Sequence, residues 1–381
     1  MNGLRNRARN RRPIRVLHMF HELRHSGCES MMFTAYDCWI DQNVDCELVA
    51  VGETIGDFAP QLEQRGYRIH HLKPSRFALL SGFLLLLLKR RPDVVHIHTE
   101  RASFWLALEA RLFGKRVVQT VHTLFPFTGS LRTERRLQRR IARFFNVTFV
   151  AVGPSVAHHE QVRFGNTAEV IWNWVDLDNF APANPEQRAD ARGSFGLAET
   201  DFVVTTVGNC WPLKNHGLVI GAMALDTTPD DVVYLHVGDD SVGVGCDERQ
   251  HAAGQPNGSA IRFLGTRSDV AHVLHASDLL LMPSSYEGGA LAVVEALATD
   301  TPVLVGDSPG LRDLNALSSD VRLVGLDPAE ISNRIAEIRL LARDGTLDFQ
   351  GRAIATHWFD PARGVARYAE LYRNQPQGGP R

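Results

Sequence analysis

The sequence predicts an α/β protein with two doubly wound parallel sheets. Three observations support this fold class. The chain has 381 residues, and at about 150 residues per domain this length suggests two domains. Short β-branched runs alternate with longer stretches of helical periodicity, and the alternation restarts after an interruption near residue 182. Such alternation is typical of parallel strands joined by crossover helices.

Two series of apolar runs define the expected strands. The first series is RVLHMF (15–20), DCELVAV (45–51), YRIHHL (67–72), DVVHIH (93–98), RVVQTVH (116–122) and VTFVAVG (147–153). The second is DFVVTTVG (201–208), VVYLHVG (232–238), IRFLG (261–265), LLLMPS (ending at Ser284) and PVLVG (302–306).

The stretch APANPEQRADAR interrupts the pattern with proline, alanine and charge, so it predicts a linker near residues 182–192. We therefore expect an N-terminal domain over residues 1–185 and a C-terminal domain over residues 186–358. A terminal helix and tail, residues 359–381, should pack back on the N-terminal domain.

Composition narrows the class of protein further. Hydrophobic residues make up 44% of the chain and charged residues 22%, which argues against a disordered or fibrous chain. The net charge of −2 argues against affinity of the whole chain for nucleic acid. Five scattered cysteines with no C-x-x-C pair favour a reduced, cytoplasmic setting. The apolar run Phe77–Leu88 is too short to span a bilayer and predicts a buried helix.

The segment SSYEGGALAVVEALATDTPVL (284–304) carries two carboxylates eight positions apart, Glu287 and Glu295. Glu287 lies in an expected loop, and a helix is predicted over Ala290–Thr299. The glycine pair 288–289 permits close approach of a ligand, and free amides at a helix start favour an anion such as phosphate. Glu295 lies beside the apolar face and needs hydrogen-bond partners, which ribose hydroxyls could supply. In the alternative interpretation Glu295 pairs with a core cation and Glu287 is an exposed loop charge.

This segment resembles the E-x7-E signature of the family 4 retaining glycosyltransferases, which have the GT-B fold of two facing Rossmann-like domains with a cleft between them. Further stretches agree with the family in order and spacing. They are HSGCES (25–30), RPDVVHIH (91–98), VVQTVHT (117–123), VIWNWVDLDNF (170–180), VGNCWPLKNH (207–216) and FLGTRSDVAHVLHASDLLLMPSSYEG (263–288). The resemblance spans nearly the whole chain.

The resemblance implies that the C-terminal domain binds a nucleoside diphosphate sugar and the N-terminal domain binds the acceptor. Lys214 would neutralise the diphosphate, and Glu295 would hold the ribose. Arg267 would lie at the nucleobase pocket, and Gly27 would close on the phosphate. The backbone amides expected to cradle the diphosphate are those of Gly288, Gly289, Ala290 and Leu291.

The resemblance also implies two catalytic residues: Glu287, which would contact the donor sugar, and His122, which would help to stabilise the transition state. For each residue a plainer role is open: a surface or packing residue for Lys214, Arg267 and His122, and a turn for Gly27. His98 and His216 are expected either to be packing residues or to support residues that contact the ligand.

Four positions depart from the family pattern. The first loop has Ser26-Gly27 instead of two glycines. Asn209 stands in the donor site where the family has an arginine, so one positive charge at the diphosphate is missing. Trp174 replaces a glycine and would reshape the joint between domains or offer a stacking platform. Asp300 also replaces a glycine, and aspartate tolerates left-handed backbone better than most residues.

The predicted function is retaining transfer of a sugar, from UDP as the preferred nucleotide, to a hydroxyl of a glycan, a lipid-linked or a small-molecule acceptor. No cofactor or metal is expected, because no D-x-D occurs at a convincing strand end and Asp239 and Asp240 follow a strand as VGDD. The helix Leu131–Phe145 carries six arginines. These arginines either attract an anionic surface, such as the inner face of a membrane or a lipid phosphate acceptor, or form a side of the helix that is simply in contact with solvent. The alternative functions are a sugar-nucleotide epimerase, a phosphorylase, and an inactive module that binds nucleotide sugars.

Overall fold

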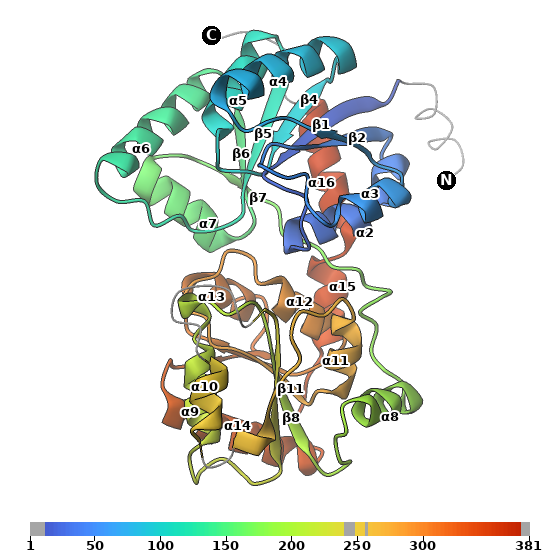
Figure 1. The fold of residues 1–381 in the computed structure, drawn as a ribbon, viewed down its shortest axis with the longest axis vertical. Coiled ribbons are helices and arrows are strands. Elements are labelled where there is room, and N and C mark those ends of the chain that lie inside the picture. Colours follow the sequence, from blue (N-terminus) through green and yellow to red (C-terminus); the bar gives the residue numbers. More distant parts are fainter. Residues whose placement is uncertain (1–11, 240–247, 256–257, 375–381) are drawn as a thin grey trace. The chain divides into compact units, whose positions relative to one another are not determined.

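The computed structural model describes residues 12–239, 248–255 and 258–374. The described chain forms two α/β units (Figure 1). The first unit contains the chain up to Trp174 together with the segment from Pro361 onward, and the second runs from Val175 to Asp360. Asp240 and the tail 375–381 lie outside the described residues.

The first unit is built on a seven-stranded sheet in which every pair is parallel, in the order β3-β2-β1-β4-β5-β6-β7. Strand order reverses between β1 and β4, because β2 and β3 extend the sheet on one side and β5 to β7 on the other. The strands are β1 (Ile14–Phe20), β2 (Val44–Ala50), β3 (Arg68–His71), β4 (Val94–Ile97), β5 (Arg116–Val121), β6 (Thr148–Ala151) and β7 (Glu169–Val170).

Helices connect these strands, as parallel pairing requires. The last helix of the chain, α16, belongs to this unit and packs against α2. The helices are α2 (Gly27–Asp41), α3 (Ala59–Arg65), α4 (Arg76–Arg90), α5 (Ser103–Leu112), α6 (Gly129–Phe144), α7 (Pro154–His159), the π-helical turn Glu160–Phe164 and α16 (Pro361–Asn374).

The second unit has a six-stranded parallel sheet in the order β10-β9-β8-β11-β12-β13. Here the order reverses between β8 and β11. The strands are β8 (Phe202–Val207), β9 (Val232–Val237), β10 (Ile261–Phe263), β11 (Leu279–Met282), β12 (Val303–Gly306) and β13 (Val321–Val324). The helices are α8 (Pro185–Ser194), α9 (His216–Met223), α10 (Glu248–Ala253), α11 (Val270–Ala276), α12 (Leu291–Ala298), α13 (Pro309–Asn315), α14 (Pro328–Arg343) and α15 (Gly351–Trp358), with short 3-10 turns at Pro212–Lys214 and Gly258–Ala260.

Every apolar run that predicted a strand forms one, within a residue or two at each end. The central strands β4, β9, β11 and β12 are buried along their whole length, as expected when helices cover both faces of a parallel sheet. Two strands were not predicted. Both interrupt their apolar pattern with a charged residue, Glu169 in β7 and Arg322 in β13.

The predicted linker at 182–192 is wrong, because most of it is helix α8. Asn184 caps this helix: its side chain accepts a hydrogen bond from the backbone N–H of Gln187, and the Gln187 side chain accepts one from the backbone N–H of Asn184. Pro185 occupies the first turn. Asparagine, proline and glutamine at these positions form a capping box and mark a helix start rather than a break.

The expectation of a buried helix at 77–88 is only partly met. The run lies in α4, which buries Leu79, Phe83, Leu86 and Leu87. Phe77, Leu85 and Leu88 remain exposed, by 87%, 66% and 54%. Within the described ranges, no helix combines the length and the apolar character needed to cross a bilayer.

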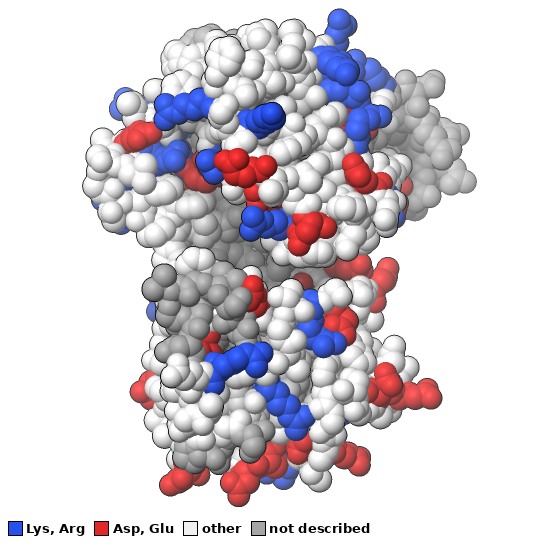
Figure 2. Space-filling model, in the orientation of Figure 1, with Lys and Arg blue, Asp and Glu red and all other residues white. Residues whose placement is uncertain are grey.

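The described cysteines Cys28, Cys38, Cys46 and Cys210 form no disulfide. Basic and acidic side chains are interspersed over the face in view in Figure 2. This mixture agrees with the net charge of −2.

Candidate active site

The donor-site residues predicted from the sequence follow the two strands that flank the reversal of strand order in the second unit. Asn209 and Lys214 follow β8, whereas Glu287 and the glycine pair follow β11. In open α/β sheets a crevice forms at the carboxyl ends of the strands where the order reverses, and ligands bind there. Topology alone therefore brings these two loops together.

An ion pair joins the two loops. Lys214 Nζ lies 2.6 Å from Glu287 Oε1, and the two side chains are only 25% and 13% exposed. Asn215 adds a second connection, since its amide donates to the Pro283 carbonyl at 2.8 Å and to Ser285 Oγ at 2.6 Å. The interpretation of Glu287 as an exposed loop charge is wrong. The pair places a cation and a carboxylate in the loops that follow β8 and β11.

Helix α12 begins at Leu291, directly after this loop, and no side chain caps it. Ala290 is the N-cap, and its carbonyl accepts from Val293 and Val294. The first amides of a helix have no intrahelical partner and carry the positive end of the helix dipole. The start of α12 is thus a site suited to an anion.

Gly310, in the first turn of α13, packs directly against the backbone of this loop. A Cβ at this position would overlap the Glu287 carbonyl oxygen and approach that of Gly288 to 3.3 Å. Only glycine lets α13 pack this closely. The backbone of residues 287–288 is consequently held against a helix rather than left as a free loop.

Glu295 lies one turn into α12, whose other residues from Val293 to Ala298 are buried. Burial raises the pKa of its carboxyl to about 7. No residue of the described ranges forms an ion pair or a side-chain hydrogen bond with this carboxylate, so the predicted alternative of a core arginine or lysine partner is not observed. A half-buried carboxylate without protein partners is available to ligand hydroxyls.

Two other predicted donor-site residues are engaged elsewhere. The exposed Asn209 accepts a hydrogen bond from the Asp239 backbone at 3.0 Å, and so links the ends of β8 and β9. Arg267 donates to both carboxylate oxygens of Asp269, at 2.8 and 2.6 Å, and its guanidinium lies over the Phe195 ring. Neither residue forms a hydrogen bond or an ion pair with Lys214, Glu287 or Glu295.

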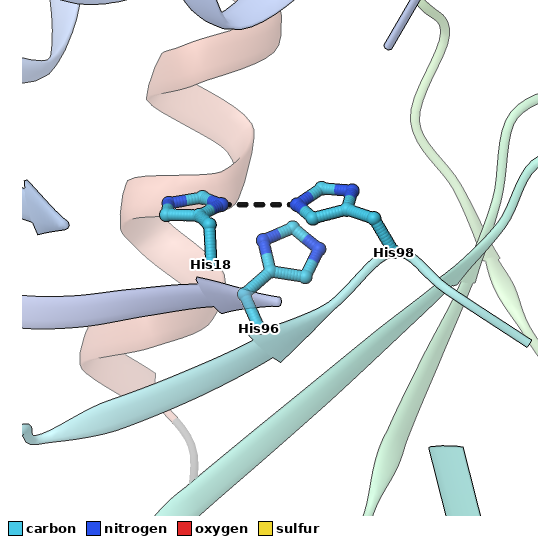
Figure 3. Close-up of side chains that lie close together, drawn as sticks. All are labelled: His18, His96 and His98. Atoms are coloured by element: carbon cyan, nitrogen blue, oxygen red, sulfur yellow. Dashed lines mark hydrogen bonds between the residues drawn. The ribbon is translucent and has the colours of Figure 1, made fainter. Parts of the chain in front are cut away.

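In the first unit, polar residues gather where strand order reverses between β1 and β4. His18 lies on β1, His96 on β4, and His98 directly follows β4 (Figure 3). His18 and His98 face each other through a hydrogen bond of 2.9 Å between Nδ1 and Nε2. His96 uses both ring nitrogens elsewhere, with the hydroxyls of Tyr372 at 2.6 Å and Thr120 at 2.7 Å.

His122, the predicted catalytic histidine, directly follows β5 and joins this cluster. Its Nε2 lies 3.1 Å from His98 Nδ1 and 3.5 Å from Cys28 Sγ. Cys28 follows Gly27 in the first turn of α2, so the structure brings the predicted loop glycine next to the predicted histidine. Burial lowers the pKa of His122 to about 4 and that of His18 to about 3. Both imidazoles are therefore neutral at pH 7.

The structure corrects one prediction and confirms another. Trp174 is 3% exposed, donates from its indole nitrogen to the Met31 carbonyl at 2.8 Å and packs on Trp39, so it is not a stacking platform for a ligand. Asp300 has φ of 60°, the left-handed backbone that its replacement of a glycine implied. His216 is buried against His236 at 3.1 Å, which is consistent with packing.

The sequence analysis missed Cys28, His18 and Gly310. One signal was present for the histidines. His96 and His98 alternate along β4 and therefore share a face of the sheet, and His18 occupies the adjacent strand in register with His96. No comparable pattern marks Cys28 or Gly310, which are identified only by their packing.

Comparison with known proteins identifies the family of the chain. Residues 14–179 match the profile of "Glycosyltransferase Family 4" and residues 187–339 that of "Glycosyl transferases group 1". An Escherichia coli UDP-Gal:α-D-GlcNAc-diphosphoundecaprenol α-1,3-galactosyltransferase is 30% identical over 77% of this chain and 78% of its own length. A D-inositol 3-phosphate glycosyltransferase of Corynebacterium urealyticum is 25% identical over 80% of this chain and 77% of its own.

Among solved structures, Anabaena HepE in complex with UDP and glucose superimposes with a TM-score of 0.78, at 20% identity, over 94% of this chain and 99% of that one. This likeness concerns the fold, which is GT-B. The profile matches cover both halves of the chain, and the relative from E. coli covers most of both proteins. The chain belongs to glycosyltransferase family 4.

Proposed function

We propose that the protein transfers a sugar from a nucleoside diphosphate sugar, with UDP as the preferred nucleotide, to an acceptor hydroxyl, and that it retains the anomeric configuration. The observation that carries this proposal is the Glu295 carboxylate, half-buried and without a protein partner among the described residues, one turn inside a helix that begins four residues after Glu287, the ion-pair partner of Lys214. The hydroxyls of a ribose would donate to Glu295, and a diphosphate would accept from Lys214 and from the first amides of α12.

In this reaction negative charge builds on the departing diphosphate. Lys214 would exchange Glu287 for a phosphate oxygen, and the first amides of α12 would donate to the same group. Interactions that strengthen as charge develops stabilise the transition state more than the bound substrate. The exchange would free Glu287, 13% exposed in the ion pair, to contact the donor sugar.

Retention is supported by the resemblance of Glu287 and Glu295 to the E-x7-E signature. UDP is supported by the bound nucleotide of HepE and by the UDP-galactose named for the E. coli relative. We further propose that transfer requires no metal, because Lys214 and the start of α12 supply the positive potential that a metal would otherwise provide at the diphosphate.

The relatives offer two classes of acceptor, a lipid diphosphate sugar and an inositol phosphate. Helix α6 favours the first. Arg139 is buried between Glu100 and Glu160, but other side chains of this helix are exposed. They include the basic Arg132, Arg136 and Arg140 and the apolar Leu137 and Phe144. Basic and apolar side chains together suit the surface of an anionic bilayer.

A donor screen tests the proposal. The protein is incubated with UDP-, GDP-, ADP- and dTDP-sugars, with either a lipid diphosphate-linked acceptor or inositol phosphate, and with or without EDTA. We expect UDP release that depends on the lipid-linked acceptor and is unchanged by EDTA, and a product with the anomeric configuration of the donor by proton NMR. Inversion, or a donor altered without acceptor, would contradict the mechanism.

Vesicle sedimentation tests the role of α6. We expect binding to vesicles containing phosphatidylglycerol, little binding to phosphatidylcholine alone, and loss of binding in the double variant Arg136→Glu and Arg140→Glu. Charge reversal at Arg334, on α14 of the second unit, is the matched control and should leave binding intact. Equal loss in both variants would show a general charge effect instead of a surface on α6.

A further inference from the structure

Three side chains at the carboxyl edge of the first sheet have the arrangement of a metal site. Cys28 Sγ lies 3.6 Å from His98 Nδ1 and 3.5 Å from His122 Nε2, and the two nitrogens are 3.1 Å apart. A tetrahedral zinc ion with bonds of about 2.3 Å to sulfur and 2.0 Å to nitrogen separates sulfur from nitrogen by about 3.5 Å and nitrogen from nitrogen by about 3.3 Å. The triangle fits these separations to about 0.2 Å.

From this match we infer that Cys28, His98 and His122 bind one Zn²⁺ ion. One thiolate and two imidazoles are ligands that zinc prefers. The fourth position would be left for water or another ligand, as in zinc sites with three protein ligands. All three side chains are half-buried, so an ion can reach them.

A neighbouring trio, His18, His96 and His98, also lies close enough to ligate an ion (Figure 3). It is the weaker candidate, because both ring nitrogens of His96 are committed to buried hydroxyls. Ligation by His96 would break one of these hydrogen bonds. The Cys28 sulfur, in contrast, contacts the two imidazoles that would share the ion.

The surroundings support the inferred site. When His98 ligates through Nδ1, its Nε2–H can donate to His18 Nδ1 at 2.9 Å, the outer hydrogen bond that fixes the orientation of most histidine ligands. A cavity of about 10 Å³ adjoins the three ligands, His18 and Trp39, which is room for roughly one water molecule.

Binding requires a proton to leave. Zinc binds imidazole in its neutral form and cysteine as the thiolate. Zinc must therefore displace the thiol proton to solvent and form a bond to the thiolate. In the zinc-bound form His98 carries its proton on Nε2 and His122 carries its proton on Nδ1. Affinity for zinc should consequently fall as the pH is lowered.

The consequence for activity rests on the proposed function. Zinc would hold Nε2 of His122 and so withdraw this imidazole from the donor sugar. The inferred ion is thus a reversible inhibitor of transfer and not a cofactor. Removal of the Cys28 ligand should leave transfer active but insensitive to zinc.

The test uses the full chain without a histidine tag and Co²⁺ as a spectroscopic probe. We expect one Co²⁺ per chain, a thiolate charge-transfer band in the near ultraviolet, intense visible bands of a tetrahedral ion, and displacement by Zn²⁺. Cys28→Ser should lose the charge-transfer band and His98→Asn should lose tetrahedral binding. Cys38→Ser, a second half-buried cysteine of α2, is the control and should behave as the wild type.

Zinc inhibition is then measured in the transfer assay. Inhibition of the wild type and of Cys38→Ser, with resistance of Cys28→Ser, supports the full inference. A Co²⁺ spectrum and zinc affinity unchanged in both Cys28→Ser and His98→Asn would overturn the site. Stoichiometric zinc at these ligands with undiminished transfer would leave the site in place but overturn the role proposed for His122.

Discussion

Replacement of Glu295 by glutamine should raise the stability of the folded protein and weaken its binding of UDP. Burial raises the pKa of this carboxyl from an ordinary value of 4.5 to about 7. The folded state therefore binds a proton that the unfolded state releases between these two pH values. Stability contributed by the protonated carboxyl is fully present below pH 4.5 and is lost as the pH rises to 7.

The size of the effect follows from the shift. A difference of about 2.5 pKa units, at 1.36 kcal/mol per unit, gives a ceiling of about 3 kcal/mol above pH 7. Glutamine carries no charge at any pH and avoids this cost. A change of 1 kcal/mol moves the melting temperature by about 2–4 °C in units of this size. The variant should melt up to about 10 °C higher than the wild type at pH 8 and at the same temperature near pH 4.5.

Thermal melts at pH 5, 6, 7 and 8 without nucleotide measure this difference. Calorimetry with UDP should show the opposite sign, because glutamine gives weaker acceptor bonds to ribose hydroxyls, and loss of a charged hydrogen bond costs about 1.5–3 kcal/mol, or tenfold or more in affinity. Glu287→Gln is the control, since its carboxylate has Lys214 as a partner, and it should not gain stability. A Glu295→Gln variant whose stability difference is flat with pH, or negative at pH 8, would refute the reasoning.

Three further substitutions test the remaining parts of the site. Lys214→Ala should weaken UDP binding by about 10- to 100-fold, from one lost charge-assisted hydrogen bond; unchanged calorimetric affinity would place the diphosphate elsewhere. Gly310→Ala should force the Glu287 backbone outward and destabilise the protein by about 1–3 kcal/mol, whereas Gly217→Ala, where the nearest atom lies at 3.9 Å, should not; equal melting temperatures would exclude this packing role. His122→Asn should lower turnover by about 100-fold at constant UDP affinity, and a change in affinity alone would remove its catalytic role.

The fold was largely predictable because a parallel sheet buried on both faces requires apolar β-branched runs, and these are readable without knowledge of their partners. The exceptions have local causes. Strand β7 has only two residues, one of them Glu169, and β13 contains Arg322. The start of α8 was read as a break because Pro185 and the surrounding charges were considered without the cap formed by Asn184 and Gln187.

The sequence predicted which residues belong to the candidate site but not which of them contact one another. Motif resemblance indicated Lys214, Glu287 and Glu295. It did not indicate that Lys214 and Glu287, 73 positions apart, form an ion pair, because such a contact depends on the order of strands in the sheet. For the same reason the sequence placed His122 at a strand end but did not place Cys28 beside it.

The two units differ in how many of their buried polar groups have protein partners. This difference predicts how much a ligand stabilises each unit. In the first unit most ring nitrogens of the histidine cluster have protein partners, among them the Tyr372 hydroxyl of α16, although His18 Nε2 is buried without one. In the second unit Glu295 has no partner among the described residues, and Lys214 is occupied only by Glu287. Polar groups left unsatisfied in a fold are expected where function requires them. Nucleotide should therefore stabilise the second unit far more than the first, and hydrogen exchange should show protection by UDP concentrated in the loops after β8 and β11 and in α12.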